Sequence, residues 1–491
     1  MESRGRNELD ELSVLRAQGR GCGATAVDER QEHFNGIRNM TATEPMIALP
    51  PTDHIPRQYT GPSKAEIVAM RAQYTNPAIF TIYKDPLLIV EGYMQYLWDE
   101  TGRRYLDCLA GIVTISIGHE HPKYVKRVQA QVGTLNHATT IYLHPNFPML
   151  AKKLASKMPK GLEVTYFTNS GTEANELAVA MARLHTGNSD IITLRHAYHG
   201  NSATAMGFTG MNTWKFALEH GGRVHHAINP DPYRSPFSGT PEEVAHFASN
   251  DVRDIIRTAT PGKVAAFLAE PIQGAGGVTH GAPNYLREVY GHIRAAGGLC
   301  IADEVQTGFG RTGDHYWGFE NWGVVPDFVT MAKGLGNGAP IGAVTTRMDI
   351  AKSLTGRTHF NTFGGNPVSM AAGLAVLDII DEDGLQANCK ARGAEFRTGL
   401  EQLKRSYSLI GDVRGMGLML GIELVTDHAT REPAKGQAAD ILEATREAGL
   451  LIGKGGLDSN VLRVKPPMCI TAADVEFALD VLERSFAAVG R

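Results

Sequence analysis

The sequence predicts an α/β protein whose largest part is a mostly parallel, seven-stranded sheet covered by helices. From about residue 164, short apolar segments that suit strands alternate with segments that suit helices, which is the pattern of parallel strands joined by helical crossovers. From about residue 356 the pattern changes to longer helices with few strands, which predicts a second, smaller α/β domain. A chain of 491 residues is long enough for two or three domains.

These changes of pattern divide the chain into four segments. We expect a disordered extension over 1–45, an N-terminal arm with a small antiparallel unit over 46–108, a large domain over 109–355 and a C-terminal domain over 356–491. Short strand-like runs on either side of the turn at 99–102 indicate the antiparallel unit.

The large domain is expected to contain seven strands. They are Val164–Phe167, Ile191–Leu194, Val224–Ile228, Val264–Ala269, Leu299–Ala302, Phe328–Met331 and Gly342–Thr345. Leu177, Met181 and Leu184 recur at helical spacing after the first strand and predict a helix there. A last helix is expected near the C-terminus, where Thr471 can act as its N-cap. Its apolar stripe is Val475, Ala478, Val481, Leu482 and Phe486.

Composition and charge point to a small-molecule partner. The net charge of −4 leaves no basic field for nucleic acid, and no Lys/Arg run resembles a membrane anchor. No apolar run reaches the roughly 18 residues of a membrane-spanning helix. The five cysteines are scattered without C-x-x-C pairs, which indicates a reducing compartment. The first 40 residues lack a signal-peptide core and carry acids that transit peptides avoid, so we expect a cytoplasmic protein.

Two motifs that invite other interpretations are rejected. His119 and His121 stand before Pro122 in a turn rather than on one helix face, with no third ligand spaced nearby, so we expect no metal site. The segment 308–313 matches G-x-G-x-x-G. It lies five residues beyond the preceding strand and no apolar helix pattern follows, so we expect no dinucleotide site.

Polar residues that follow the predicted strands form the candidate site, because ligands bind beyond the carboxyl ends of strands in an open α/β sheet. Ser170, Gly171 and Thr172 open a helix, whose free N–H groups and positive end suit a phosphate. Tyr198 offers a ring that can stack on a flat ligand. Glu270 presents a carboxylate before a proline that stops its strand.

Two further strand ends complete this set. Asp303 ends a strongly apolar strand, so its carboxylate needs a cationic partner, and no lysine or arginine stands nearby in sequence. Lys333 follows the sixth strand in a loop with three glycines among the next five residues. Each feature alone has an ordinary structural explanation, such as a helix cap or a solvated loop lysine. Together they meet the needs of pyridoxal 5′-phosphate (PLP), which carries a phosphate, a flat pyridine and an aldehyde.

The residues from Asp303 to Gly313, followed by Met331-Ala332-Lys333-Gly334, closely resemble the signature of class III PLP-dependent aminotransferases. The resemblance spans roughly Pro86 to the C-terminus and implies PLP-dependent transferase fold type I. Other matching segments are Ser170–Glu176, Tyr198-His199-Gly200, Glu270-Pro271 and Thr362–Pro367. Within the class, the stretches 111–119 and 359–367 are most similar to the alanine–glyoxylate aminotransferase 2 branch. Asn201 departs from the arginine of enzymes for ornithine, acetylornithine or 4-aminobutyrate, which argues against those substrates.

The resemblance implies how the cofactor ring is held. Lys333 would bind the cofactor aldehyde covalently and later move the substrate proton, so Lys333 and Asp303 are the expected catalytic pair. Asp303 would keep the ring nitrogen protonated. Tyr198 and Val305 would cover the two faces of the ring, and Gln306 would approach the ring hydroxyl.

The remaining implied contacts concern the phosphate and the substrate. The cofactor-binding set also includes Ser170, Gly171, Thr172 and His199. Thr362 would complete the phosphate site from a neighbouring subunit, so a homodimer is the expected minimal unit and a tetramer stays open. Arg463 would bind the substrate α-carboxylate through its planar fork, and Glu270 would pair with Arg463 when a substrate lacks that group.

The implied reaction is ping-pong transamination between an amino donor and a small 2-oxo acid, glyoxylate or pyruvate. Alanine, β-alanine, 3-aminoisobutyrate and ω-amines remain open as donors. The alternative is a PLP-dependent phospho-lyase, racemase or decarboxylase, because one fold supports all these reactions.

Overall fold

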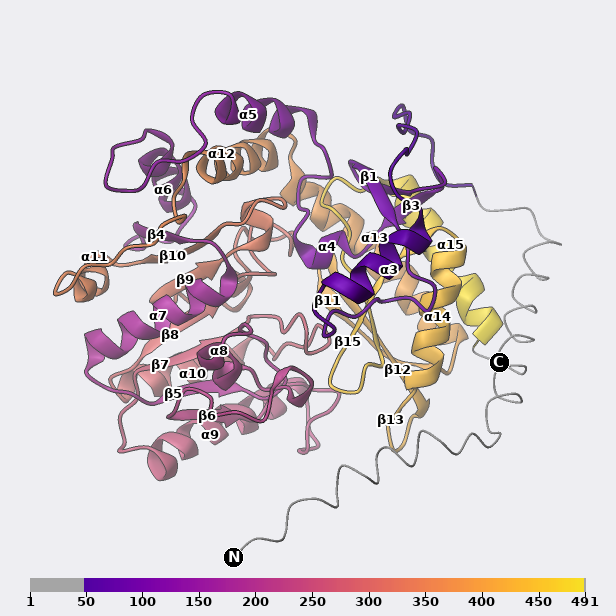
Figure 1. The fold of residues 1–491 in the computed structure, drawn as a ribbon. Coiled ribbons are helices and arrows are strands. Elements are labelled where there is room, and N and C mark those ends of the chain that lie inside the picture. The colour runs from indigo at the N-terminus through magenta and orange to yellow at the C-terminus, as the bar shows by residue number, and fades with distance from the viewer. Residues whose placement is uncertain (1–47, 490–491) are drawn as a thin grey trace, which may run out of the picture. The chain divides into compact units, whose positions relative to one another are not determined.

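A seven-stranded sheet carries the candidate site in the computed structural model, which describes residues 48–489 (Figure 1). The spatial order is β4-β10-β9-β8-β7-β5-β6. The strands are β4 Val164–Thr168, β5 Ile191–Leu194, β6 Val224–Ala227, β7 Ala266–Ala269, β8 Leu299–Asp303, β9 Phe328–Met331 and β10 Gly342–Thr346. Only β10 pairs antiparallel with its neighbours. The predicted sheet is therefore confirmed, and its strand boundaries differ by one or two residues.

Helix α7 (Gly171–Thr186) covers one face of this sheet (Figure 1). Its buried stripe consists of small residues and one methionine, and includes Ala174, Ala178 and Met181. These pack in one cluster with strand residues such as Leu268 and Ile301. The expected stripe was wrong at Leu184, which is 61% exposed. Alanines bring the helix close to the sheet, and Leu184 lies outside the stripe they define.

The other helices of the large domain pack in groups. They are α4 Ala110–Val113, α5 Pro122–Val132, α6 Asn146–Ser156, α8 Ala203–Phe208, α9 Pro241–Ala259, α10 Asn284–Ala295 and α11 Met348–Ala351, with 3₁₀ turns η1 Asn212–Trp214, η2 Gly318–Trp322, η3 Lys333–Leu335 and η4 Lys352–Leu354. Helices α9 and α10 pack against each other and contact β6 to β8, while α5 and α6 pack against α12 (Pro367–Glu382).

A small sheet links the N-terminal unit to the C-terminal part of the chain. After α3 (Lys64–Tyr74), the strands β1 (Ile89–Tyr93), β2 (Tyr96–Asp99) and β3 (Arg104–Asp107) form the antiparallel unit that the sequence predicted. Strand β14 (Leu450–Leu451) adds to β3 in parallel. The division at 108 and at 356 stays a prediction, and the expected extension over 1–45 lies outside the described residues.

The C-terminal part contains a second mixed layer of helices and strands. Its elements after α12 are α13 Leu385–Ser406, β11 Ile410–Met416, β12 Met419–Asp427, β13 Glu432–Pro433, α14 Lys435–Glu447, β15 Gly453–Gly455, β16 Val461–Val464 and α15 Ala472–Val489. The strand order is β11-β12-β16-β15, with β13 on β12. The prediction for α15 is confirmed, because the Asp474 N–H donates to the Thr471 hydroxyl and the expected apolar stripe is buried.

Residues of the two rejected motifs contact other side chains or backbone carbonyls of the protein. Nε2 of His119 lies 2.8 Å from Asp107, and Nε2 of His121 lies 3.1 Å from Asp383. Arg311, inside the glycine-rich segment, is buried and donates to the carbonyls of Leu418 and Pro466 at 3.1 and 2.8 Å. This arginine therefore ties the loop after β8 to the C-terminal part. Among residues 48–489, no helix has the length and apolarity needed to cross a membrane.

Candidate active site

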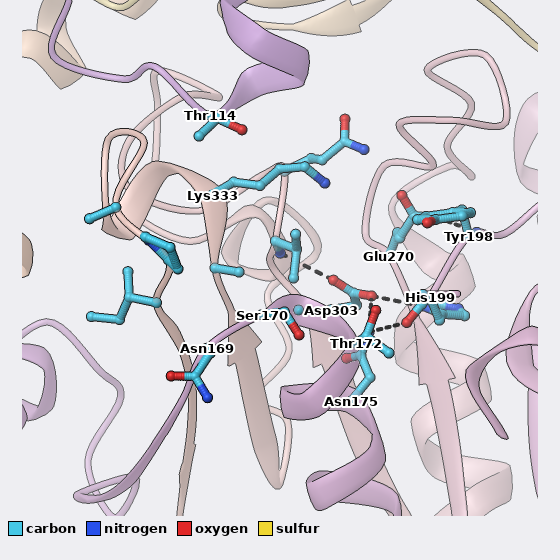
Figure 2. Close-up of a pocket in the computed structure, with 18 of the residues that line it drawn as sticks. Thr114, Asn169, Ser170, Thr172, Asn175, Tyr198, His199, Glu270, Asp303 and Lys333 are labelled. Carbon is cyan, nitrogen blue, oxygen red and sulfur yellow. Dashed lines mark hydrogen bonds and ion pairs between the residues drawn. The ribbon is translucent and has the colours of Figure 1, made fainter. Parts of the chain in front are cut away.

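The candidate site is a cavity of about 300 Å³ at the carboxyl ends of the parallel strands (Figure 2). Residues from five separate strand ends reach it, which is the position expected for ligands of open α/β sheets. Its walls include Thr114, Ser170, Gly171, Thr172, Asn175, Tyr198, His199, Gly200, Glu270, Asp303, Val305, Gln306 and Lys333. Thus the structure brings together every predicted site residue except Thr362 and Arg463.

Asp303 ends β8 with a carboxylate that is only 3% exposed and held by three donors. Nδ2 of Asn175 and Nδ1 of His199 each lie 2.8 Å from Oδ2 of Asp303, and the Val305 N–H donates to Oδ1 at 3.1 Å. Figure 2 shows these contacts converging on the carboxylate below the cavity. The arrangement fixes one carboxylate toward the cavity without any lysine or arginine partner in an ion pair, among residues 48–489.

Lys333 projects its side chain across the cavity toward Glu270 and Tyr198 (Figure 2). Its backbone has a φ of +40°, which is uncommon for a residue with a side chain and is held by the η3 turn that follows β9. Burial lowers the pKa of the Lys333 amine, while the carboxylates of Asp303 and Glu270 act in the opposite direction. A lowered pKa increases the fraction of neutral amine, which is the form that attacks an aldehyde.

The first turn of α7 forms an anion cradle. The first N–H groups of a helix have no intrahelical acceptor, and the helix end carries partial positive charge. Ser170 is the N-cap, and its hydroxyl accepts from the Glu173 N–H at 3.2 Å. Gly200, with φ +134°, closes the other side, and a Cβ there would lie 2.5 Å from Oγ1 of Thr172. The backbone therefore approaches closely around a space that suits a phosphate.

Tyr198 and Val305 both line the cavity. The Tyr198 ring packs edge-on against Trp214, with ring centroids 5.2 Å apart. Val305 lies against Gly171, where a Cβ would come within 3.0 Å of a Val305 methyl group. An aromatic ring and an apolar side chain in the wall suit contact with a flat aromatic ligand.

His199 and Gln306 line the cavity, and each contacts another polar side chain. His199 lies beside Asp303, and its Nε2 is buried without a hydrogen-bond partner among the described residues. Oε1 of Gln306 lies 3.1 Å from Nζ of Lys465, a buried lysine that the sequence analysis did not single out.

Glu270 and Arg463 both bind the backbone of Gly274, but the structure of residues 48–489 shows no ion pair between them. The N–H groups of Tyr198 and Gly274 donate to Glu270 at 3.0 and 2.8 Å. Arg463 donates instead to the carbonyls of Gly274 and Lys454, at 3.3 and 2.7 Å. Burial raises the pKa of Glu270 and lowers that of Arg463 to about 10. Arg463 lies outside the cavity wall in this arrangement.

Two residues that support Asp303 were missed by the sequence analysis. Asn175 lies in α7, and the hydroxyl of Thr330 in β9 donates to Oδ1 of Asn175 at 2.6 Å. That contact fixes the amide so that its Nδ2 faces Asp303. A polar asparagine among the buried alanines of α7 is the signal that could have revealed this role.

The fold and these side chains define a PLP-dependent enzyme of fold type I. The chain belongs to the class III aminotransferases, since the Aminotransferase class-III family model matches residues 81–486. Enzymes of this class depend on PLP, and the glycine-lined cradle, the side chains of Tyr198 and Val305 and the buried carboxylate fit that cofactor.

Individual relatives agree with this membership. A protein from Arabidopsis thaliana named alanine–glyoxylate aminotransferase 2 homolog 2, mitochondrial, is 50% identical over 437 residues, which cover 89% of this chain and 90% of that protein. The Homo sapiens protein named alanine–glyoxylate aminotransferase 2, mitochondrial, is 42% identical over 453 residues, with 88% of each chain covered. The predicted similarity to this branch is confirmed.

Solved structures show the same fold. A PLP-bound amine transaminase from an uncultivated Pseudomonas species has a TM-score of 0.79 at 30% identity, covering 85% of this chain and 99% of that chain. A phospholyase from Arthrobacter, in complex with phosphoethanolamine, has a TM-score of 0.80 at 36% identity, covering 86% and 99%. The fold is therefore shared by enzymes with different reactions.

The predicted cytoplasmic location is wrong in light of these relatives, because the Arabidopsis thaliana and Homo sapiens proteins are both named as mitochondrial. The prediction relied on acidic residues in the first 40 positions, which lie outside the described residues.

Proposed function

We propose that this aminotransferase moves an amino group between a small amino donor and a small 2-oxo acid, glyoxylate or pyruvate. The observation that carries the proposal is that Lys333 and Asp303 face the same cavity as a helix N-terminus suited to phosphate. The names of the relatives at 42–50% identity support alanine and glyoxylate as one substrate pair. Among the alternatives, a phospho-lyase reaction is represented by the Arthrobacter structure, which is less identical.

In this proposal the protein binds, orients and moves protons. PLP supplies an electron-withdrawing pyridine that stabilises negative charge on the substrate carbon. Lys333 would hold the cofactor through its aldehyde, and its amine, when free, would move a proton at the substrate carbon. Asp303 would keep a proton on the ring nitrogen, and Tyr198 and Val305 would position the ring. The N-terminus of α7 would bind the phosphate, with Gly171 and Thr172 as donors.

The substrate carboxylate is assigned to Arg463. Its guanidinium now donates to two backbone carbonyls, and its Nε is buried without a partner among the described residues. A carboxylate entering the cavity can accept two parallel bonds from this fork when the side chain turns toward it. Glu270 stands nearby as the counter-charge for donors that have no carboxylate.

A half-reaction screen tests this function. Each candidate donor is mixed with holoenzyme alone, and conversion to pyridoxamine phosphate is followed by absorbance. We expect conversion with alanine or a related donor, and we expect it to proceed without any 2-oxo acid. Arg463→Gln is the matched variant: KM should rise roughly 10- to 100-fold for donors with an α-carboxylate and stay near wild type for simple amines. Elimination of phosphate from phosphoethanolamine without any conversion would instead indicate the lyase.

The active unit in this proposal is a homodimer. Ile141, Tyr142 and Leu143 are 72%, 69% and 104% exposed, and Phe363 is 62% exposed. The two segments are adjacent, since the rings of His137 and Phe363 lie 5.6 Å apart. Such an apolar patch is typical of a covered surface, and a second copy of the chain is its proposed partner.

Thr362 provides the test of a shared site. It is exposed and lies outside the cavity wall of its own chain, next to this patch. We expect Thr362→Arg and Lys333→Ala homodimers to be inactive, whereas mixed dimers should regain activity at one site, where an intact Lys333 meets an intact Thr362 from the other chain. The measurement is the activity of refolded mixtures, with sedimentation to confirm dimers. Lack of recovery in confirmed mixed dimers would exclude sharing through Thr362.

A further inference from the structure

A buried lysine lies behind the cavity wall, and no carboxylate of residues 48–489 pairs with it. Lys465 follows β16 and is 1% exposed. Its Nζ donates to the Gly274 carbonyl and to Oε1 of Gln306, both at 3.1 Å. Lysine is rarely buried this fully unless it is paired with an acid, so this position calls for an explanation.

The surroundings of Lys465 disfavour its charge. The charged groups around it are Arg463, Glu270, Lys333 and Arg311. Burial lowers the pKa of Lys465, with Arg463 as the next cause and Glu270 acting in the opposite direction. In either charge state the amine retains at least two N–H groups, and the two contacts use both.

Gln306 is the residue that connects Lys465 to the cavity. Gln306 lines the cavity and Lys465 does not. An amide side chain can be reversed without changing its shape, so its orientation follows from its partners. In the structure Lys465 donates to Oε1 of the amide, and the Nε2 group has no hydrogen bond to any of residues 48–489. Those N–H donors are therefore available to a molecule in the cavity.

A glycine makes this contact possible. A Cβ on Gly274 would lie 2.2 Å from Oε1 of Gln306. The Gly274 carbonyl also accepts from Arg463 at 3.3 Å, so the lysine, the arginine and the glutamine all depend on the turn after β7. The bare backbone of that turn lets Lys465 and Gln306 lie side by side.

We propose that Lys465 is a positioning residue, which holds the Gln306 amide with its N–H donors directed at the oxygen on the cofactor ring. The inference rests on the proposed contact between Gln306 and that oxygen. A donor there stabilises negative charge on the oxygen, and thereby favours loss of the proton from the nitrogen that joins Lys333 to the cofactor. Lys465 thus adjusts the protonation of the resting enzyme without touching substrate.

The test is a pH titration of the visible absorbance of the holoenzyme. Lys465→Met keeps the volume of the side chain but removes its donors. We expect the pKa seen by absorbance to rise by about 0.5 to 1 unit, and the affinity of the apoenzyme for PLP to fall by roughly 2- to 10-fold. A titration identical to wild type would overturn the proposal.

A double-mutant cycle separates positioning from a simple effect of charge. Gln306→Leu should itself raise the titration midpoint, and Lys465→Met should then add nothing, because the group it positions is gone. A shift of equal size in the Gln306→Leu background would show that Lys465 acts by its charge and would refute the positioning role.

A second variant leaves Lys465 in place in case its replacement prevents folding. Gln306→Glu keeps the contact with Lys465 but puts an acceptor oxygen where the N–H donors stood. Its midpoint should rise further than that of Gln306→Leu, and an unchanged midpoint would contradict the assigned orientation. If wild-type enzyme bound PLP without a titrating covalent absorbance, the proposed role of Lys333 would fail instead, so the two failures are distinguishable.

Discussion

Lys333→Ala is expected to lower kcat by about 10⁴-fold or more in both half-reactions. The same amine holds the cofactor and moves the substrate proton in the proposed function, so its loss removes two steps. No other lysine of the described chain lines the cavity, and the nearby Lys465 is engaged by Gly274 and Gln306. Stopped-flow absorbance with amino donor alone, followed by 2-oxo acid alone, measures each half.

Two controls make this result specific to the amine. Adding methylamine to the Lys333→Ala enzyme should restore part of the proton transfer, because a free amine can enter the space left by the side chain. Lys123→Ala removes an exposed lysine that pairs with Glu382 and Asp383, and its kcat should match wild type. A Lys333→Ala enzyme that cycles at the wild-type rate would contradict the assigned role.

The sequence was sufficient to predict the sheet and most of the cavity wall, because both depend on local patterns. Short apolar strands have a recognisable length, and parallel strands bring their carboxyl ends to one edge. Residues at or just after the ends of β4, β7, β8 and β9 therefore had to lie near each other, and Ser170, Glu270, Asp303 and Lys333 do. The roles assigned to these residues remain proposals.

Contacts between distant segments could not be predicted. Thr330 and Asn175 lie 155 positions apart, and their bond orients the amide that faces Asp303. Lys465 and Gln306 are separated by 159 positions. No local pattern encodes such pairs, because they depend on which elements the fold places side by side.

The direction of a long side chain could not be predicted from the sequence either. The family resemblance implied that Arg463 binds the substrate carboxylate, yet in the structure its donors contact the carbonyls of Gly274 and Lys454. An arginine with several rotatable bonds takes whichever acceptors its surroundings offer. Thr362 is exposed in a single chain, and the role proposed for it requires a second chain.

Asp303→Asn is expected to lower kcat by about 10²- to 10³-fold while PLP stays bound. In the wild-type site, Oδ2 of Asp303 accepts from both Asn175 and His199, so Oδ1 is the oxygen left for the cofactor apart from its contact with the Val305 N–H. Asn175 is fixed as a donor by Thr330 and forces the new amide to turn its oxygen toward it. The NH₂ group then takes the Oδ1 position, where the Val305 N–H loses its acceptor and the ring nitrogen would meet a donor.

A donor in that position favours an unprotonated ring nitrogen, which is a poor electron sink, whereas the phosphate cradle and Lys333 still hold the cofactor. The measurements are kcat, the cofactor content of the enzyme, and the protonation of the ring nitrogen by ¹⁵N NMR of labelled PLP.

Asp327→Asn is the matched control. Asp327 is also buried, with 4% exposed, and pairs with Arg294 and Arg347. It precedes β9 and therefore lies at the end of the strand opposite to the cavity. That variant should lose thermal stability with normal turnover per folded enzyme, because a neutral amide replaces the buried carboxylate that pairs with Arg294 and Arg347, and the position lies outside the cavity wall. Normal turnover in Asp303→Asn, or an equal loss in Asp327→Asn, would mean that the carboxylate at the end of β8 supports the fold rather than the ring nitrogen.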